Sequence, residues 1–307
     1  MSVPTRWAAA AGGRAPLAAA QGHCAASEAV PVPVDLHLHT AHSDGRLAPA
    51  VVVEAAVARG LKTIAVVDHD VVSGLEEARA AGERLGVEVI AGVELTARWR
   101  GRTCHILGYG FDPATPRLHK TLAHGRAAAE AAVAAALDAL RARGYDLSSA
   151  DLARYHARYP TPTTLLLALV QRRLLRSRAD LLAILPLLRA SAQGMPAAEA
   201  IGLMHAAGGA AVLAHPGRRA RGVALDRAAV AALAAAGLDG VEVVHPSHDG
   251  AQRAAFGDLA DALGLVATGG SDWHGRPRDP LPGSLGVDGT RFARLRARIE
   301  QRRAAVS

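Results

Sequence analysis

Short apolar runs alternate along the chain with longer Ala-rich segments of helical periodicity. Each run ends in polar residues before the next helical segment begins. Short, continuous apolar runs between helices are typical of buried parallel strands. The seven predicted strands are Val32–Leu38, Thr63–Val67, Val87–Val93, Cys104–Gly108, Ala210–Ala214, Gly240–Val244 and Leu265–Thr268.

The segments between these runs predict helices. Repeated strand–helix units are typical of an α/β protein. Seven strands suit a closed or nearly closed barrel better than an open sheet, although periodicity alone does not separate the two. The predicted helices are Ala48–Arg59, Gly74–Leu85, Ala197–Ala207, Arg227–Ala236 and Ala251–Leu263.

The interval 111–195 breaks this alternation and predicts consecutive helices instead of strands. We interpret it as a helical insertion or cap that divides the barrel into residues 32–110 and 196–290. Loops that follow barrel strands emerge at the catalytic face, so such an insert could choose the substrate. Residues 1–31 predict a disordered extension, and residues 291–307 a C-terminal helix. The insert helices are predicted over Arg117–Arg143, Ser149–His156, Thr163–Leu175 and Ala179–Arg189.

Composition narrows the function classes. Half of the residues are hydrophobic and only 3% are aromatic, so the core must consist of Ala, Val and Leu. No apolar run approaches the ~20 residues that span a bilayer, so no membrane segment is expected. The net charge of +7 comes mostly from scattered arginines, which fits an anionic substrate or a compositional bias and argues against a nucleic-acid groove. Cys24 and Cys104 form no disulfide framework or thiolate zinc site, which favours a cytoplasmic protein. No obligate protein partner is indicated.

Metal-binding residue types stand at one end of every predicted strand. Residues two apart on a strand point to the same face, so His37 and His39 project together. Imidazole and carboxylate ligands suit Zn, Mn or Fe, and a pair of such metals can hold a phosphoryl group and activate hydroxide. A lone histidine is more often structural, but this convergence predicts a multinuclear hydrolytic site. The other strand-end residues are Asp44, His69, Glu94, His105, His215, His245, His248, Asp272 and His274.

These motifs resemble those of the polymerase and histidinol phosphatase (PHP) family. The matching segments are Asp35-Leu-His-Leu-His-Thr with Ser43-Asp-Gly, Val67-Asp-His-Asp, Gly92-Val-Glu, His105-Ile-Leu-Gly-Tyr, Ala214-His-Pro-Gly and Gly270-Ser-Asp-Trp-His-Gly. As an ordered set they are highly specific, whereas each alone would be weak. The resemblance implies a distorted seven-stranded TIM-like (β/α) barrel that holds two to three divalent metal ions, with Mn²⁺ favoured and Zn²⁺, Fe²⁺ or Mg²⁺ as alternatives.

The resemblance also assigns ligands. It implies that His37, His39 and Asp272 bind one metal and that Glu94 bridges to a second, which His105 and His215 complete. Asp44, His69 and His274 would hold the third. A metal-bound hydroxide would attack phosphorus, so no side-chain nucleophile is required.

Within the family, the helical insert is similar to that of small bacterial nucleotide phosphoesterases. These remove phosphate from 3′,5′-nucleoside bisphosphates, and some degrade short RNA from its 5′ end. The resemblance therefore implies a small phosphorylated substrate, a nucleotide or a short 5′-phosphorylated oligonucleotide. This chain departs from that branch in one segment that bears on the nucleotide preference. Where the branch carries Arg-Pro-His, this chain has Tyr159-Pro-Thr-Pro-Thr.

Several residues near the motifs leave two interpretations open. Arg218 could bind a substrate phosphate through its planar guanidinium or be a solvated loop residue. His245 and His248 could touch substrate, with His248 a substrate-binding candidate, could protonate the leaving group, or could orient metal ligands. Asp35 and Asp68 are expected to orient neighbouring imidazoles.

Two other function classes compete with phosphoester hydrolysis. His/carboxylate barrels also cleave carbon–nitrogen or carbon–oxygen bonds, as amidohydrolases do, but no bridging lysine is visible at a strand end. A non-catalytic metal-binding accessory protein is the third alternative, and the complete ligand set argues against it.

Overall fold

The computed structural model describes residues 34–153, 162–190, 194–218 and 225–306. Within these ranges the strands are β1 (Val34–Leu38), β2 (Thr63–Val66), β3 (Glu88–Trp99), β4 (Arg102–Tyr109), β5 (Met195–Pro196), β6 (Ala210–Leu213), β7 (Gly240–Val244) and β8 (Val266–Gly269). The helices are α1 (Pro49–Ala58), α2 (Leu75–Leu85), α3 (Pro116–Arg141), α4 (Ser149–Ala153), α5 (Pro162–Gln171), α6 (Arg178–Ala190), α7 (Ala197–Ala206), α8 (Arg227–Ala235), α9 (Gly250–Leu263) and α10 (Gly289–Ala304).

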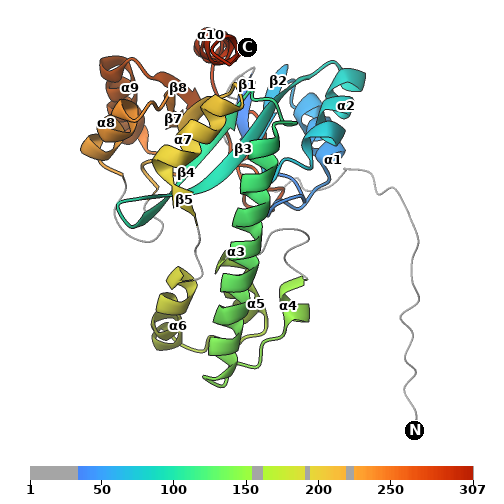
Figure 1. Ribbon diagram of the computed structural model, residues 1–307. Coiled ribbons are helices and arrows are strands. Elements are labelled where there is room, and N and C mark those ends of the chain that lie inside the picture. The colour runs from blue at the N-terminus through green and yellow to red at the C-terminus, as the bar shows by residue number, and fades with distance from the viewer. Residues whose placement is uncertain (1–33, 154–161, 191–193, 219–224, 307) are drawn as a thin grey trace. The chain divides into compact units, whose positions relative to one another are not determined.

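Seven strands form one continuous sheet in the order β1-β2-β3-β4-β6-β7-β8 (Figure 1). The two outer strands of this path approach each other, because Leu38 and Trp273 form a parallel bridge and His39 N–H donates to Trp273 O at 3.0 Å. The sheet is therefore nearly closed, with helices on its outer face, and the expected barrel-like α/β fold is confirmed.

The prediction of parallel strands throughout is wrong for β4, which pairs antiparallel with both β3 and β6. The cause is the tight turn at Arg100 and Gly101, both with positive φ, which joins β3 and β4 into a hairpin. Antiparallel strands need only such a short connection, whereas parallel ones need a crossover. The hairpin also extends β3 to Trp99, well beyond the predicted end at Val93, and its outer part pairs with the unpredicted two-residue strand β5.

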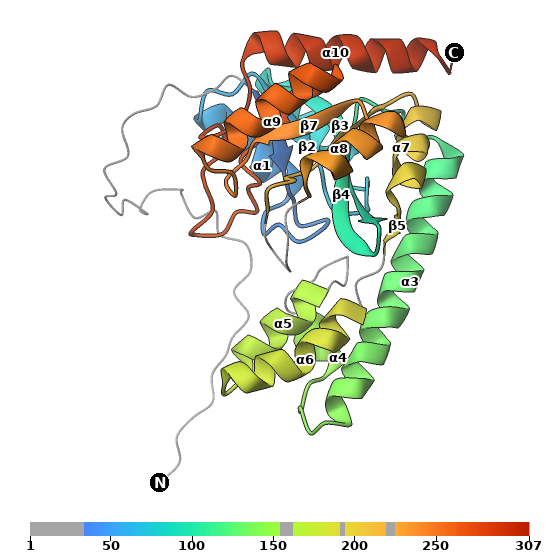
Figure 2. The same cartoon turned by 90° about the vertical axis from the view of Figure 1, so that its left-hand side faces the viewer.

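Two apolar layers hold the barrel together. Outside the sheet, apolar residues of α1, α2, α7, α8 and α9 pack against the strands in the larger core cluster. Inside, residues such as Leu36 and Tyr109 meet Phe292, Leu295 and Ile299 of α10. Helix α10 therefore lies across the end of the barrel where the parallel strands begin (Figure 2). We call this the closed end of the barrel. At the opposite, open end, loops follow the parallel strands, and the predicted site residues lie there.

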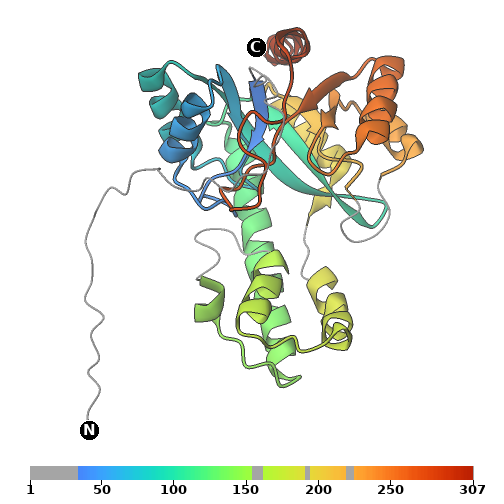
Figure 3. The ribbon, with the colours of Figure 1, turned by 180° about the vertical axis from the view of Figure 1, so that it is seen from behind.

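Helices α3 to α6 occupy the interval predicted to be an insert. Helices α4, α5 and α6 gather around the C-terminal half of α3 (Figure 3) and share a core of their own that includes Leu137, Leu140 and Leu165. Arg172, from the arginine-rich stretch after α5, pairs with Asp151 and Asp146 at 2.9 and 3.1 Å, so it ties helices together. The predicted extension 1–31 lies outside the described residues. Within the described ranges, no helix has both the length and the apolar character needed to cross a bilayer.

Asp239, just before β7, anchors α10 and α7 to the closed end of the barrel. Its fully buried carboxylate accepts hydrogen bonds from Arg302 at 2.6 Å, Arg298 at 3.1 Å, His205 at 2.9 Å and the Ala211 N–H at 2.9 Å. Burial alone would raise the pKa of Asp239, but these donors lower it to about 2.

We expect Asp239→Asn to lower the free energy of unfolding by about 3 kcal/mol, because it removes the buried anion from two partly buried arginines. Since the folded pKa lies below the unfolded value of 3.8, the stability that ionised Asp239 contributes, roughly 2 kcal/mol, is present above pH 4 and lost as the pH falls toward 2. Urea denaturation across this pH range measures both effects. Asp261→Asn, at an exposed pair with Arg294, is the control and should change stability little. Equal stabilities of the two variants would contradict the prediction.

Candidate metal centre

Glu94, in the middle of β3, is the residue around which the predicted site residues converge. Its side chain is only 1% exposed. Five imidazoles surround its two oxygens: Oε2 lies 3.1 Å from His37 Nε2, 3.2 Å from His39 Nε2 and 3.6 Å from His69 Nδ1, and Oε1 lies 2.6 Å from His105 Nδ1 and 3.0 Å from His215 Nε2. Residues in β1 and β4, and just after β1, β2 and β6, thus meet at one carboxylate.

Asp272, after β8, adds a second carboxylate to the same space. Its Oδ1 lies 3.3 Å from His37 Nε2 and 3.2 Å from His39 Nε2. Donor atoms of His37, His39, Glu94 and Asp272 all lie within 4.8 Å of one another. This group contains two imidazoles and two carboxylates, a set that suits one divalent cation.

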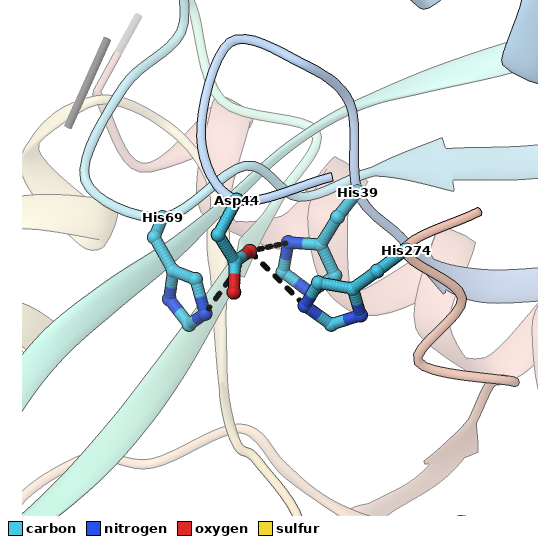
Figure 4. A group of neighbouring side chains, drawn as sticks. All are labelled: His39, Asp44, His69 and His274. Carbon is cyan, nitrogen blue, oxygen red and sulfur yellow. Dashed lines mark ion pairs between the residues drawn. The ribbon is translucent and has the colours of Figure 1, made fainter. Parts of the chain in front are cut away.

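Asp44 is the centre of a neighbouring group with His39, His69 and His274, whose donor atoms likewise lie within 4.8 Å of one another. Figure 4 shows the Asp44 carboxylate between the three imidazoles, with Oδ1 3.0 Å from His274 Nε2 and 3.9 Å from a ring nitrogen of each of the other two. His39 belongs to both groups, since Nδ1 faces Asp44 and Nε2 faces Glu94. The two candidate cation positions are therefore adjacent.

The backbone is strained where it presents these residues. Asp70, His215 and Asp272 have φ angles of 52°, 26° and 52°. These lie in the left-handed region, which is unfavourable for residues other than glycine. Each follows a strand at the open end of the barrel. Strain of this kind costs roughly 1–3 kcal/mol per residue and clusters at functional sites. Gly270, two residues before Asp272, is required because a Cβ there would collide with Cβ of His37.

Carboxylates dominate the electrostatics of this pocket. Burial alone would raise the pKa of Glu94, but the surrounding imidazoles, with His69 foremost, hold that pKa well below its usual range. Neighbouring imidazoles overcome burial in the same way at Asp44 and Asp272, whose pKa values are also lowered. Burial would lower the pKa of His39, yet its carboxylate neighbours raise it to about 10. The buried Glu94 and the partly buried Asp44 and Asp272 thus stay ionised and require positive charge beside them.

Comparison with known proteins identifies the family to which this arrangement of residues belongs. The PHP domain model matches residues 35–198. The chain is 34% identical to a 3′,5′-nucleoside bisphosphate phosphatase of Chromobacterium violaceum, over 83% of this chain and 90% of the relative. The chain belongs to the PHP family.

Other relatives of this PHP protein carry different activities. A 5′-3′ exoribonuclease of Haemophilus influenzae is 33% identical over 78% of this chain and 89% of its own length. A phosphoribosyl 1,2-cyclic phosphate 1,2-diphosphodiesterase of Eggerthella lenta is 34% identical over 79% and 94%. A Bifidobacterium adolescentis structure assigned as a metal-dependent phosphoesterase superposes with a TM-score of 0.76 at 29% identity, over 87% of this chain and 97% of that chain. The chain is thus a metal-dependent phosphoesterase of the PHP family.

The donor atoms of the PHP site fit metal ions. Among the described residues, the buried side-chain atoms that lack a hydrogen bond include both ring nitrogens of His39, Asp44 Oδ1 and His69 Nδ1. A buried polar atom left without a partner is costly. His39 Nε2 nevertheless lies 3.2 Å from oxygens of Glu94 and of Asp272, so a cation between them would satisfy all three. Nitrogen and oxygen donors without thiolates suit Mn, Fe or Zn.

His245 is tied to Asp272, and its tautomer follows from its neighbours. Its Nδ1 accepts from the Ser247 N–H at 3.0 Å, so Nε2 carries the proton and donates to Asp272 Oδ2 at 3.2 Å. The side chain is buried, at 2% exposure. Of the alternatives for His245, this geometry favours a positioning role: it holds the outer oxygen of Asp272 and leaves Oδ1 facing His37 and His39.

His248 has both ring nitrogens occupied by main chain. Its Nδ1 donates to Val243 O at 2.9 Å, and its Nε2 accepts from the Gly217 N–H at 2.9 Å. Gly217 O also accepts from Gln252 at 3.2 Å. Because the imidazole is buried and has no free nitrogen, the geometry disagrees with a substrate contact or an acid role for His248. The residue instead holds the loop that connects His215 to Arg218.

The expectation that Asp35 and Asp68 orient imidazoles is also wrong. Asp35 accepts three main-chain N–H groups, those of His37, Ser271 and Gly283, and so joins β1 to the loops after β8. Burial raises the pKa of Asp35 to about 6. Asp68 accepts from Thr40 N and Oγ1 and from Ser43 Oγ, at 2.8, 2.6 and 2.5 Å, and thereby shapes the loop that carries Asp44. Both carboxylates position backbone rather than rings.

Two residues at the site were not predicted from the sequence. Glu242, inside β7, is fully buried and contacts His37 and the main chain of His215. A lone carboxylate in an apolar strand is the signal that could have revealed it, because a buried charge requires partners. Arg276 donates to Asp44 O at 3.1 Å and Oδ2 at 3.2 Å, and no sequence pattern distinguishes it from the other arginines.

Proposed function

We propose that the chain hydrolyses phosphate monoesters of nucleotides, of the 3′,5′-nucleoside bisphosphate type, or releases nucleotides from short 5′-phosphorylated oligonucleotides. The observation that carries the proposal is the gathering of eight imidazoles and carboxylates with Glu94 at their centre in one largely buried cluster, with arginines at its rim. This arrangement suits an anionic phosphoryl group better than an uncharged amide, the alternative substrate of a carbon–nitrogen hydrolase.

The proposed cofactors are two or three divalent ions, with Mn²⁺ as the first choice. His37, His39 and Asp272 would hold the first, with Glu94 shared with a second ion that His105 and His215 complete. Asp44, His69 and His274 would hold the third. Bound divalent ions supply Lewis-acid charge for the phosphoryl group and for the attacking water. The described side chains supply the buried, pre-positioned ligands and the rim that binds the remaining phosphate oxygens.

Two arginines at the rim support a phosphorylated substrate. Arg218 NH1 lies 3.7 Å from Asp272 Oδ2, and Arg276 NH2 lies 3.2 Å from Asp44 Oδ2. Their side chains are 46% and 38% exposed, so each guanidinium keeps N–H groups directed to solvent while its charge stands beside an outer carboxylate of the site. A planar guanidinium suits bidentate binding of phosphate oxygens. We therefore assign both arginines to the substrate rather than to a solvated loop.

The nucleotide preference rests on the relatives and on the helical insert. The relatives in this family include a nucleoside bisphosphate phosphatase and an exoribonuclease, and the chain covers nine-tenths of each. Helices α3 to α6 lie between β4 and β5 and could choose among esters. Residues 159–161, at the departure Tyr159-Pro-Thr-Pro-Thr, lie outside the described residues.

A phosphate-release assay with Mn²⁺ tests the substrate. The panel holds nucleoside 3′,5′-bisphosphates, the matching 3′- and 5′-monophosphates, a five-membered cyclic phosphate, 5′-phosphorylated RNA trimers and an amide panel. We expect release from the bisphosphate or the 5′-phosphorylated trimer to exceed that from either monophosphate at least tenfold. Preference for the cyclic phosphate would overturn the nucleotide assignment, and cleavage of amides alone would overturn phosphoester hydrolysis.

Arg218→Ala should raise KM for the preferred ester about 10- to 100-fold with a smaller change in kcat, because a charge-assisted hydrogen bond contributes roughly 1.5–3 kcal/mol. Steady-state kinetics measures both constants. Arg294→Ala, on the exposed face of α10, removes the same charge far from the rim and should leave KM unchanged. An unchanged KM in Arg218→Ala would mean that Arg218 is a solvated loop residue that does not bind the substrate.

A further inference from the structure

Glu242 is the fully buried carboxylate of β7, and none of the proposed ligand sets includes it. Its Oε1 lies 2.9 Å from His37 Nδ1, and its Oε2 accepts the His215 N–H at 2.8 Å. These two contacts reach two different proposed metal ligands, one in β1 and one just after β6.

The contacts of Glu242 indicate the tautomer of His37. Oε2 accepts a main-chain N–H, and Oε1 lies 2.9 Å from His37 Nδ1, a geometry in which a carboxylate oxygen accepts and Nδ1 carries the proton. His37 Nε2, which lies 3.1 Å from Glu94 Oε2 and 3.3 Å from Asp272 Oδ1, is then the nitrogen that offers its lone pair to a cation. Hydrogen bonding of this kind fixes the ring and raises its basicity toward a metal.

The second oxygen of Glu242 acts on a strained segment. The N–H that it accepts belongs to His215, whose φ of 26° is unfavourable for a residue with a side chain. The His215 imidazole in turn lies 3.0 Å from Glu94 Oε1. A single carboxylate therefore fixes one ligand by its ring and another by its backbone, on opposite sides of Glu94.

We propose that Glu242 is a positioning residue that sets the metal affinity of the site by fixing the tautomer of His37 and the backbone of His215. The inference rests on the metal-bound state of the proposed function but on no particular substrate. Glutamine cannot replace it: two donors face Glu242, and an amide offers one oxygen and one NH₂, so one contact becomes donor against donor.

Metal titration without substrate tests the proposal. The probe is Mn²⁺ added to the metal-stripped full chain, followed by equilibrium dialysis with elemental analysis. We expect Glu242→Gln to weaken Mn²⁺ binding about 10- to 100-fold, the usual effect of losing such a partner. Asp239→Asn is the matched control, because Asp239 is an equally buried carboxylate just before the same strand. It should lose stability but keep Mn²⁺ affinity.

Double-mutant cycles separate positioning from general damage. If Glu242 acts through His37, the effects of Glu242→Gln and His37→Ala on Mn²⁺ affinity should be strongly non-additive. His105, which has no contact with Glu242 among those described, provides the second cycle, and its effect should be nearly additive. Additivity in both cycles, or unchanged affinity in Glu242→Gln, would overturn the proposal.

Imidazole ¹⁵N NMR of the wild-type protein loaded with Zn²⁺ keeps the proposal testable should the variant not fold. His37 is assigned by comparison with His37→Ala. The proposal requires a protonated Nδ1 and a metal-coordinated Nε2 for His37, and the opposite tautomer would refute it. Failure of every substrate in the phosphate-release panel would count against the proposed function and leave this result unaffected.

Discussion

Glu94→Gln is expected to lower kcat/KM for the preferred phosphate ester at least about a thousandfold, roughly 4 kcal/mol of transition-state stabilisation. Glutamine keeps the size of the side chain but removes the charge that five imidazoles share. One of the two oxygens becomes an NH₂ group, which cannot bind a cation. The substitution therefore affects two adjacent metal positions at once, which is why its effect should exceed that of losing a single ligand. Single-turnover phosphate release at saturating Mn²⁺ measures it.

The same strand supplies a control for this substitution. Glu88, at the start of β3, carries a carboxylate that is 40% exposed and pairs with Arg296 at 2.7 Å on the surface. Glu88→Gln should leave kcat/KM within about twofold, since exposed pairs of this kind contribute little. Wild-type kcat/KM in Glu94→Gln would mean that the central carboxylate has no part in the chemistry, and the site would have to be placed elsewhere.

Removal of metal is expected to abolish phosphate release and to lower the free energy of unfolding by about 3 to 4 kcal/mol, relative to protein in Mn²⁺ at a hundred to a thousand times its Kd. The physical reason is the cluster of ionised carboxylates Asp44, Glu94 and Asp272, whose pKa values are all held low and which all lie within 3.9 Å of a ring nitrogen of His39. A cation bound there stabilises only the folded chain. Calorimetry of dialysed, chelator-treated protein before and after Mn²⁺ addition measures the difference.

Asp239→Asn tests whether the stabilisation by Mn²⁺ comes from binding in the pocket around Glu94. The variant should start from a lower stability, because its defect lies at the closed end of the barrel, yet gain as much from Mn²⁺ as the wild-type protein does. Glu94→Gln should gain much less. An equal gain in all three proteins would point to Mn²⁺ binding outside the pocket around Glu94.

Much of the barrel could be predicted because its strands are short apolar runs that end in polar residues. The β7 prediction, Gly240–Val244, agrees with the structure at both ends. The direction of β4 could not be predicted, because an apolar run has the same composition whether the strand is parallel or antiparallel to its neighbours. His105 nevertheless reaches the site, since an antiparallel strand begins at the end where its parallel neighbours finish. The reversal comes from the turn at Arg100 and Gly101, whose positive φ angles are observed in the structure.

The proximity of strand-end residues was predictable, whereas the roles of the residues behind them were not. The spacing of His37, in β1, and His39, just after it, predicts from sequence alone that both point to the same side. The role of His248 depends on its contact with Gly217, and this arises only when the loops after β6 and β7 pack together. Glu242 acts through His37, 205 positions away. Tertiary contacts of this kind have no local pattern in the sequence.

Anomalous diffraction from crystals grown with Mn²⁺, recorded at the manganese absorption edge, tests the central claim most directly. The account predicts two or three peaks within coordination distance of Glu94, Asp272 and Asp44, with His37 Nε2 directed at one of them. Peaks located only elsewhere on the molecule, or a pocket around Glu94 that stays free of manganese at saturating concentration, would contradict it.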